Sequence, residues 1–453
     1  MKLGNLETYQ VQRDLIYPLL YMQERGIRVD IEAMRAESAA ITVFENEKQE
    51  ELNQIVGKPM NVKSFPEMTD YFYGQLKIKP FTKVVMKDGQ RTSRITVDKK
   101  ALIKLAAGSQ GRKPVYAAKV IQDIREARDK KAKFLDVKLG ADNRLRSSFG
   151  FARSGRLRSS KDIHGEGLNI QTLPPWMKKF ILADEGYVIY DIDKAQAENR
   201  IVAYIAPDLN MIDAFESGRD IHRRTAAMFH NKREDEISTI KGTSLTGRLR
   251  SERDDGKDGN HALNYKESAN GLAEQMQISL VKATELRNLY LSLYPGIKTY
   301  WNWVLNKLKQ DQTLVNFFGR TYQFLDKVSE NSISDALYFI PQSTVADIIN
   351  RWGLLYVWEN PDFEGFELLN QVHDSIVFQI PISLGADKHF EMVSKLISNL
   401  DQTLTWGSRS FYIPTDCKLG LGFAKMQEHK GVLGQKLDKK EFVESFKLIT
   451  KES

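Results

Sequence analysis

The sequence predicts an α+β chain that is mostly helical and contains two or three subdomains. Its 453 residues exceed what a single ordinary hydrophobic core organises. Helical patterns dominate residues 195–309, with breaks near 242–259 and at 295–296, whereas runs typical of buried strands are few and short. Hydrophobic residues make up 42% of the chain and charged residues 28%, a balance that predicts packed globular structure rather than disorder.

The N-terminal third contains three predicted helices. Apolar residues recur at helical spacing from Leu15 to Arg25, and Gly26 ends that helix. Asp98 is placed to cap a short helix over 99–106, and residues 115–139 have the pattern of a long, basic, amphipathic helix. The region that follows the first helix is mixed and polar.

Two later regions each place an aspartate at the end of a predicted strand. The apolar run over 186–193 is typical of a buried strand and ends on Asp193. Strands are also predicted over 366–372 and 375–380, with Asp374 in the turn between them.

Charge and cysteine content narrow the class of protein. The formal net charge is +7, which fits a protein that binds phosphate backbones and equally fits a solvated basic face. The single cysteine, Cys417, excludes an intramolecular disulfide and a cysteine-based zinc site, so we expect a reducing compartment. Because neither a signal peptide nor a membrane span is recognisable, we expect a soluble, cytoplasmic protein that does not contact membranes.

Asp193 and Asp374 are candidates for two-metal phosphoryl transfer. That chemistry uses carboxylates to hold paired Mg²⁺ ions about 3.5–4 Å apart. Aspartates at strand ends also serve as turn formers or helix caps, and spacing in the sequence leaves both explanations open.

Residues 193–200 resemble motif A of family A DNA polymerases, the bacterial DNA polymerase I group, whose usual form is Asp-Tyr-Ser-Gln-Ile-Glu-Leu-Arg. Lys194 and Ala195 replace the usual aromatic residue and serine. Residues 220–226 resemble another segment of the family, and residues 371–374 resemble motif C, in the family's order. The residues that match motif A are Asp193, Gln196, Glu198 and Arg200.

Four residues spaced by four, Arg253, Lys257, His261 and Tyr265, lie on one face of a predicted helix. The pattern resembles motif B on the mobile fingers helix, and a solvated stripe is the alternative. His261 stands where the family usually has Phe or Tyr, so it contacts the nucleotide or simply packs as a flat ring.

The resemblance implies a role for each of these residues. Arg253 and Lys257 would grip the incoming triphosphate, Lys257 would also protonate the leaving pyrophosphate, and Tyr265 would stack near the templating position. The other implied nucleotide-binding residues are His261, Glu198, Gln196 and His222. Asp254, Asp255 and Asp258 would place negative charge beside this phosphate site.

The implied DNA contacts come from other segments. Arg156, in a Ser-Gly-Arg-Leu sequence, and Gln342 resemble residues that contact the minor groove, where a pair's geometry can be tested without reading its sequence. His373 would lie near the primer end unless it is a buried structural histidine. Arg200 is also expected to contact DNA.

The fold implied by the resemblance is a right-hand polymerase with a small antiparallel sheet in its palm. We expect a thumb over 1–145, a palm over 146–206 and 327–425, and fingers over 207–326. The lysine-rich tail over 426–453, with a predicted helix over 439–449, is expected to be solvated and dispensable.

The predicted function is template-directed DNA synthesis with dNTPs on a primer–template. The implied cofactor is Mg²⁺, as two ions, with Mn²⁺ as a substitute. Because family members carry the exonuclease before the segment seen here at residue 9, we expect a phage-type form without proofreading. The expected protein is a monomer in a bacterium or phage-infected host that works with a separate exonuclease or processivity factor.

Two rival functions remain open from the sequence. Single-subunit RNA polymerases often have His-Asp-Ser in motif C, and Ser375 follows Asp374 here. Glu198, which blocks the sugar 2′-hydroxyl in DNA polymerases of this family, argues against that rival. The second is a catalytically silent nucleic-acid-binding scaffold, against which the intact Asp193, Lys257 and Asp374 argue.

Overall fold

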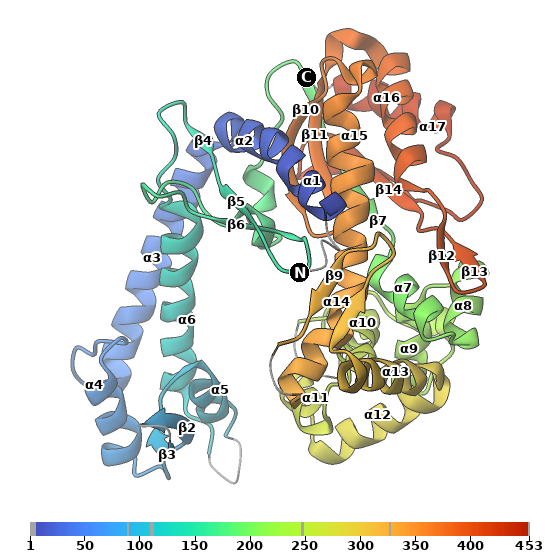
Figure 1. Ribbon diagram of the computed structural model, residues 1–453. Coiled ribbons are helices and arrows are strands. Elements are labelled where there is room, and N and C mark those ends of the chain that lie inside the picture. The colour runs from blue at the N-terminus through green and yellow to red at the C-terminus, as the bar shows by residue number, and fades with distance from the viewer. Residues whose placement is uncertain (1–5, 88–89, 109–112, 246–248, 326–327, 452–453) are drawn as a thin grey trace. The chain divides into compact units, whose positions relative to one another are not determined.

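The computed structural model describes residues 6–87, 90–108, 113–245, 249–325 and 328–451. The chain forms two compact units (Figure 1). The smaller unit comprises Val29–Leu145 with Asp162–Leu168, and the larger unit comprises Met1–Arg28, Arg146–Lys161 and Asn169–Ser453. Each has a hydrophobic core of its own, and each is described by itself.

Two helices that lie alongside each other, α3 (Ile31–Val56) and α6 (Tyr116–Lys130), form the body of the smaller unit (Figure 1). Asp30 caps α3 by accepting from the Ala33 N–H at 2.9 Å, and the helix ends at Gly57 in the left-handed conformation. Sequence analysis missed α3 because Met34 and Leu52 are its only buried residues, so its apolar periodicity is weak.

Short elements complete the smaller unit. The predicted cap is confirmed, because the Asp98 side chain accepts from the Ala101 N–H at 3.1 Å at the start of α5 (Lys99–Ala107). Helix α6 is shorter than predicted, since a π-helical turn follows it over Lys131–Leu135. The remaining elements are α4 (Phe65–Thr69), the π-helix Asp70–Gln75, β2 (Thr82–Lys87), β3 (Gln90–Ile95) and β4 (Arg144–Leu145).

A five-stranded antiparallel sheet organises the larger unit, in the order β10-β11-β7-β14-β15. Figure 1 labels the first four of these strands. The three strands predicted from the sequence are confirmed. Asp193 in β7 lies opposite Ser375 of β11 on one side and opposite Asp416 of β14 on the other. The strands are β7 (Tyr187–Lys194), β10 (Glu367–Val372), β11 (Ser375–Pro381), β14 (Thr415–Gly422) and β15 (Lys425–His429).

The C-terminal residues are part of this unit's core, so the expectation of a solvated tail is wrong. Strand β15 is the sheet's last strand, and α17 (Lys439–Thr450) packs with α16 (Gly385–Leu400). Phe442 is fully buried and stacks with Tyr190 of β7 at 6.3 Å between ring centroids. The predicted helix over 439–449 is confirmed, but its apolar face is covered.

Helix α10 (Glu252–Asn264) runs unbroken through Gly256 and Gly259, where the sequence predicts a break. Both glycines lie where α10 packs on α9 (Ile221–His230). A Cβ atom at Gly256 would lie 2.0 Å from the His222 carbonyl oxygen, and one at Gly259 would lie 2.4 Å from the Phe229 ring. The glycines therefore allow a close approach of two helices, which offsets their low helix propensity.

None of the described helices is long and apolar enough to cross a membrane.

The other helices of the larger unit surround the sheet or pack with α9 and α10. These helices are α1 (Leu6–Asp14), α2 (Ile16–Arg25), α7 (Ala197–Ile205), α8 (Leu209–Glu216), α11 (Ala269–Met276), α12 (Leu280–Leu293), α13 (Gly296–Gln310), α14 (Glu330–Asp347), the π-helix Ile348–Leu355 and α15 (Tyr356–Glu359). The small strands are β1 (Ile27–Arg28), β5 (Ser148–Phe151), β6 (Leu157–Ser160), β8 (Thr313–Val315), β9 (Thr321–Gln323), β12 (Leu404–Trp406) and β13 (Arg409–Phe411).

Candidate active site

A cleft of about 760 Å³ in the larger unit, which we call the main cleft, gathers most of the predicted site residues. Its walls come from β7 and α7, from α9 and α10, from the turn between β10 and β11, and from β14 with the segment after β15. The predicted site residues that line it are Asp193, Gln196, Glu198, Arg200, His222, Arg253, Lys257, His261, Tyr265 and Asp374.

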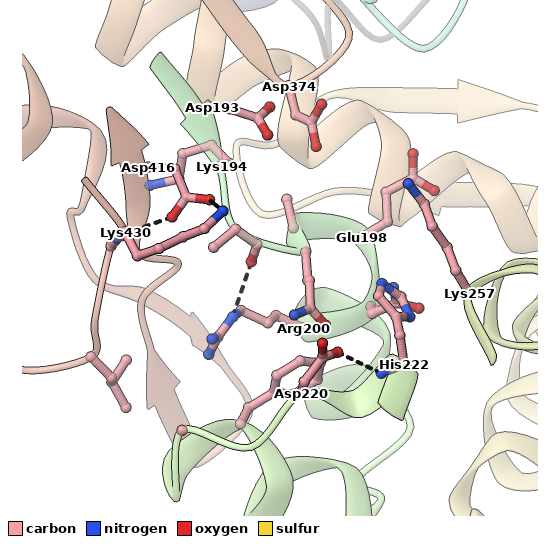
Figure 2. A pocket seen from close by; sticks show the side chains of 18 of the residues that line it. Asp193, Lys194, Glu198, Arg200, Asp220, His222, Lys257, Asp374, Asp416 and Lys430 are labelled. Carbon is pink, nitrogen blue, oxygen red and sulfur yellow. Dashed lines mark hydrogen bonds and ion pairs between the residues drawn. The ribbon is translucent and has the colours of Figure 1, made fainter. Parts of the chain in front are cut away.

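Asp193, on β7, and Asp374, in the turn between β10 and β11, point into the same part of the main cleft (Figure 2). Ser375 lies directly opposite Asp193, and the Lys194 N–H donates to the Asp374 carbonyl oxygen at 3.1 Å. Residues paired across an antiparallel ladder are close neighbours, so the turn before β11 brings Asp374 beside Asp193.

Burial raises the pKa of both aspartates. The charge of Asp374 adds to the effect at Asp193, and the charge of Glu198 adds to it at Asp374. A cation between the carboxylates would relieve this repulsion and favour their ionised forms. Carboxylate oxygens are also the donors that Mg²⁺ prefers, so these residues fit a divalent metal site.

Glu198 on α7 is held by two partners. It accepts a hydrogen bond from the Tyr265 hydroxyl at 2.7 Å and pairs with Arg156. Tyr265 is buried beyond the last turn of α10 and packs against Tyr338, with 3.9 Å between ring centroids. The Glu198 carboxylate thus connects Arg156, which is predicted to contact DNA, to Tyr265, which is predicted to lie near the template.

Gln196 and Arg200 shape the turn that leads from β7 into α7. Gln196 has φ +55°, and its Oε1 has no hydrogen-bond partner among the described residues. The Arg200 Nε donates to the Ala195 carbonyl at 3.1 Å, and its guanidinium lies 4.6 Å from the centre of the Phe215 ring. Burial lowers the pKa of Arg200 to about 10. Arg200 therefore contacts the wall of the main cleft and fixes this turn.

Arg253, Lys257 and His261 line the main cleft along one face of α10. The Arg253 Nε contacts the Asp220 carboxylate at 2.6 Å, whereas Lys257 and His261 are exposed. The His261 ring lies 5.8 Å from the Tyr265 ring at a steep angle. The helical face predicted from the spacing is confirmed, and its charged groups are accessible from the main cleft.

The acidic residues of α10 are not among the lining residues of the main cleft, although the charge of Asp254 acts on Arg253 and His222. Asp254 caps its own helix with Ser251, and Asp258 pairs with Arg250 at 2.8 Å. Asp255 is fully buried and accepts from the Leu245 N–H and from His230. Their partners lie in the segment before α10 and on α9, so the helix separates its acidic and basic faces.

His222 lies near the start of α9, beside the cationic face of α10. Its Nδ1 accepts a hydrogen bond from the Asn260 amide at 2.9 Å, which leaves the proton of the neutral ring on Nε2. Burial lowers the pKa of His222 to about 4. Because the ring is neutral near pH 7 and lines the main cleft, its Nε2–H can donate to an anionic ligand.

Of the predicted DNA contacts, Arg200 lines the main cleft, whereas Arg156, Gln342 and His373 are not among its lining residues. Gln342 on α14 lines a separate groove of about 700 Å³, together with Arg153 and the aromatic residues Tyr322 and Tyr338. His373 is exposed at the turn before Asp374, so the alternative of a buried structural histidine is wrong.

The turn that carries Arg156 rests on a buried ion pair. The Arg320 guanidinium pairs with Asp347 at 2.7 Å, and both side chains are almost fully buried. Gly155 has φ +82°, and a Cβ atom there would lie 2.6 Å from the Arg320 guanidinium. Glycine is therefore required in front of Arg156 for both conformation and space.

The sequence analysis did not identify several charged residues of the main cleft, among them Arg219, Asp416, Lys418 and Lys430. Asp416 lies on β14, directly opposite Asp193 on the neighbouring strand β7, and Lys430 follows β15. The sequence signal that could have predicted strand β14 is the alternation of apolar with other residues over 415–422. This signal is weak because the segment contains two glycines.

Comparison with known proteins identifies the family. The sequence matches DNA polymerase family A over residues 31–425. The chain belongs to DNA polymerase family A. It is 24% identical to the thermostable DNA polymerase I of Thermus aquaticus over 427 residues, covering 91% of this chain and 47% of that protein. It is 25% identical to DNA polymerase I of Deinococcus radiodurans over 411 residues, covering 87% and 40%. The chain spans about half the length of the curated relatives it matches.

A solved structure shares the fold of this family A chain. It is the POL domain of Pol1 from M. smegmatis in complex with DNA primer-template and dNTP. The TM-score is 0.75 at 22% sequence identity, and the match covers 91% of this chain and 70% of that one. The α+β polymerase fold predicted from the sequence is confirmed. Family A DNA polymerases are metal-dependent, in agreement with the paired carboxylates of the main cleft.

Proposed function

We propose that this chain is a template-directed DNA polymerase that extends a primer 3′ end with dNTPs and releases pyrophosphate. The observation that carries the proposal is the pairing of Asp193 and Asp374 in one cleft with the cationic face of α10. Nucleotidyl transfer needs carboxylates for metal ions and cations for a triphosphate, and few other reactions need both in this arrangement.

In this proposal, Asp193 and Asp374 hold two Mg²⁺ ions, for which Mn²⁺ would substitute. When bound, such ions supply an activated 3′-hydroxyl and charge stabilisation at the leaving oxygens. Both side chains are half-buried, one on β7 and the other in the turn before the adjacent strand β11, so their carboxylates are positioned before any ligand arrives.

The triphosphate would bind along the exposed face of α10. Lys257 is free to move toward a phosphate and to donate a proton to the leaving pyrophosphate, and Arg253 would share its charge between Asp220 and the ligand. His222 would donate its Nε2–H, and His261 would offer a ring nitrogen near the sugar. Gln196, with an unpaired Oε1, would contact the nucleotide from the opposite wall.

Sugar selection would depend on Glu198, because its carboxylate is fixed by Tyr265 and Arg156 rather than free to move away. A side chain held in this way excludes a 2′-hydroxyl more strictly than a mobile one. Arg156, Gln342 and His373 would contact the primer–template, and the aromatic groove beside Gln342 suits stacked bases of a single strand.

We further assign the subdomains in these terms. The smaller unit would be the thumb, the five-stranded sheet with α16 and α17 would form the palm, and the helices between 207 and 326 would form the fingers. In this assignment the palm includes the tail after residue 425, because β15 and α17 complete the sheet and its core.

Primer extension with Mg²⁺ and four dNTPs tests the proposal. We expect Asp193→Asn and Asp374→Asn to lower the rate of addition by at least about a thousandfold, while primer–template affinity stays within about threefold because other residues contact the phosphates. A parental protein that binds primer–template but does not extend it would instead support the silent scaffold.

The same assay separates DNA synthesis from RNA synthesis. We expect the parental protein to prefer dNTPs, and Glu198→Ala to raise ribonucleotide incorporation about tenfold or more, since the 2′ position gains space. Glu198→Asp is the matched variant, because it keeps the charge but shortens the reach. Equal use of rNTPs and dNTPs by the parental protein would favour the RNA polymerase alternative.

A further inference from the structure

The main cleft includes a wall that the family match does not cover. The match ends at residue 425, yet residues 430–433 line the cleft beside β14. In Figure 2, Lys430 and Lys257 lie on opposite sides of the view, with Asp193 and Asp374 between them. Both lysines line the cleft that holds the carboxylate pair, and only Lys257 belongs to a motif of the family.

The segment after β15 is anchored rather than loosely placed. Asp416 accepts from the Lys430 ammonium at 3.1 Å and from the Gly431 N–H at 2.8 Å. A Cβ atom at Gly431 would lie 2.5 Å from the Thr415 carbonyl oxygen, so the backbone of Gly431 packs directly on β14. These contacts fix the position of the backbone at Lys430, and 63% of the Lys430 side chain remains exposed.

The charges around Lys430 balance one another. Asp416 and Glu428 both contact Lys430, and Lys418 contacts Glu428 at 3.3 Å. Asp416 lies directly opposite Asp193, so its carboxylate would repel an anion at the metal site if Lys430 did not neutralise it. An exposed ammonium beside that carboxylate can turn toward an incoming anion at little conformational cost.

We propose that Lys430 is an additional binding residue for a polyphosphate, either the triphosphate of the incoming nucleotide or the leaving pyrophosphate. This inference rests on the proposed polymerase function. Asp416 positions the segment and Lys430 supplies the charge, so the two residues of one ion pair have opposite effects on the ligand. Charge-assisted contacts to phosphate are strong enough for one lysine to change affinity severalfold.

Two measurements test the proposal on the full chain. The first is the equilibrium Kd of a complementary dNTP for the complex with a primer–template whose 3′ end is dideoxy-terminated. The second is the inhibition of primer extension by inorganic pyrophosphate. We expect Lys430→Met to weaken one or both by about tenfold and Lys430→Arg to restore most of the loss. Asp416→Asn should leave binding unchanged or tighter, since Asn still accepts from the Gly431 N–H.

Each outcome decides the inference. A change in the dNTP Kd alone assigns Lys430 to the incoming triphosphate, and a change in pyrophosphate inhibition alone assigns it to the product. Values within twofold of the parental protein in both assays would overturn the proposal. Equal weakening by Asp416→Asn and Lys430→Met would also overturn it, because the pair would then only hold the segment in place.

Controls separate local from general effects. Lys440→Met, at an exposed lysine on α17, should leave both assays unchanged. Thermal unfolding of each variant should stay close to that of the parental protein, because the Lys430 side chain is mostly exposed. A parental protein that extends no primer would overturn the polymerase function and this inference together, whereas parental extension with unaffected Lys430→Met binding overturns the inference alone.

Discussion

At the scale of single residues, Lys194 shows how a departure from a family motif is accommodated. It replaces the usual aromatic residue after Asp193, and its side chain is fully buried. Its ammonium contacts Asp401 at 2.8 Å, the Thr415 hydroxyl at 2.9 Å and the Leu400 and Ile413 carbonyls. Burial lowers the pKa of Lys194 to about 8, and the Asp401 carboxylate opposes that shift.

Lys194→Met should therefore lower the free energy of unfolding by about 2–4 kcal/mol, because a half-buried carboxylate and two carbonyls lose their donor. Asp401 is one-fifth exposed, so water can solvate part of the orphaned charge, which keeps the loss moderate. Urea unfolding at pH 7 measures it, with the exposed Lys440→Met as control. Substitutions at surface sites usually change the free energy of unfolding by less than about 0.5 kcal/mol. A loss below that value would show that the four contacts of Lys194 contribute little to stability.

At the scale of elements, the contact between α9 and α10 depends on Gly256. Alanine has the higher helix propensity, by about 1 kcal/mol, so the substitution would stabilise an isolated helix. Here a Cβ atom would lie 2.0 Å from a backbone oxygen of α9, which cannot move without shifting that helix. The steric clash outweighs the gain in propensity.

We expect Gly256→Ala to lower the free energy of unfolding by about 1–3 kcal/mol and to weaken dNTP binding, because Arg253 and Lys257 move with α10. Gly150→Ala is the matched control, since a Cβ atom at Gly150 would meet no atom within 4 Å. Unfolding and equilibrium dNTP binding measure the two effects. Unchanged stability would mean that α9 and α10 separate freely.

The packing of α16 and α17 against β7 predicts a pH dependence. His389 is fully buried, and its neutral ring donates from Nε2 to the Pro381 carbonyl while Nδ1 accepts from the Tyr190 hydroxyl. Burial lowers the pKa of His389 to about 4, whereas an unfolded histidine titrates near 6.5. The unfolded chain therefore binds this proton first as the pH falls.

Stability should decline as the pH falls from about 6.5 toward 4, and His389 alone should account for about 2–3 kcal/mol of that decline. His222, whose pKa is also lowered to about 4, adds to it. Urea unfolding between pH 7 and 5 should show a smaller decline for His389→Gln than for the parental protein. Carboxylates with raised pKa values act in the opposite direction but are common to both proteins. Equal slopes would exclude His389 as a contributor.

At the scale of the whole molecule, two separate cores predict two unfolding events. Phe72 is fully buried in the smaller unit, and Phe442 is fully buried in the larger unit. All six tryptophans lie in the larger unit, so tryptophan fluorescence reports on that unit, while circular dichroism reports on both.

Phe72→Ala should lower the stability of the smaller unit by about 3–5 kcal/mol and leave the fluorescence midpoint unchanged. Phe442→Ala is the corresponding variant in the larger unit. It should lower the stability of that unit by a comparable free energy and therefore shift the fluorescence midpoint. If Phe72→Ala moved the fluorescence transition as far as the dichroism transition, the chain would unfold as one cooperative unit.

The sequence alone determined the family, the α+β class and ten of the residues that line the main cleft, because motif spacing and strand periodicity are local properties. The face shared by Arg253, Lys257 and His261 follows from four-residue spacing on one helix, and Asp374 follows from the turn between two apolar runs. Only the tertiary structure decided that Asp374 lies beside Asp193, since strand pairing between distant segments leaves no local pattern. It also decided that Gly256 serves close helix packing, that the Lys194 ammonium is buried against Asp401 and Thr415, and that the C-terminal residues form part of the cleft wall. In each case a long-range contact overrides the local preference of the residues involved.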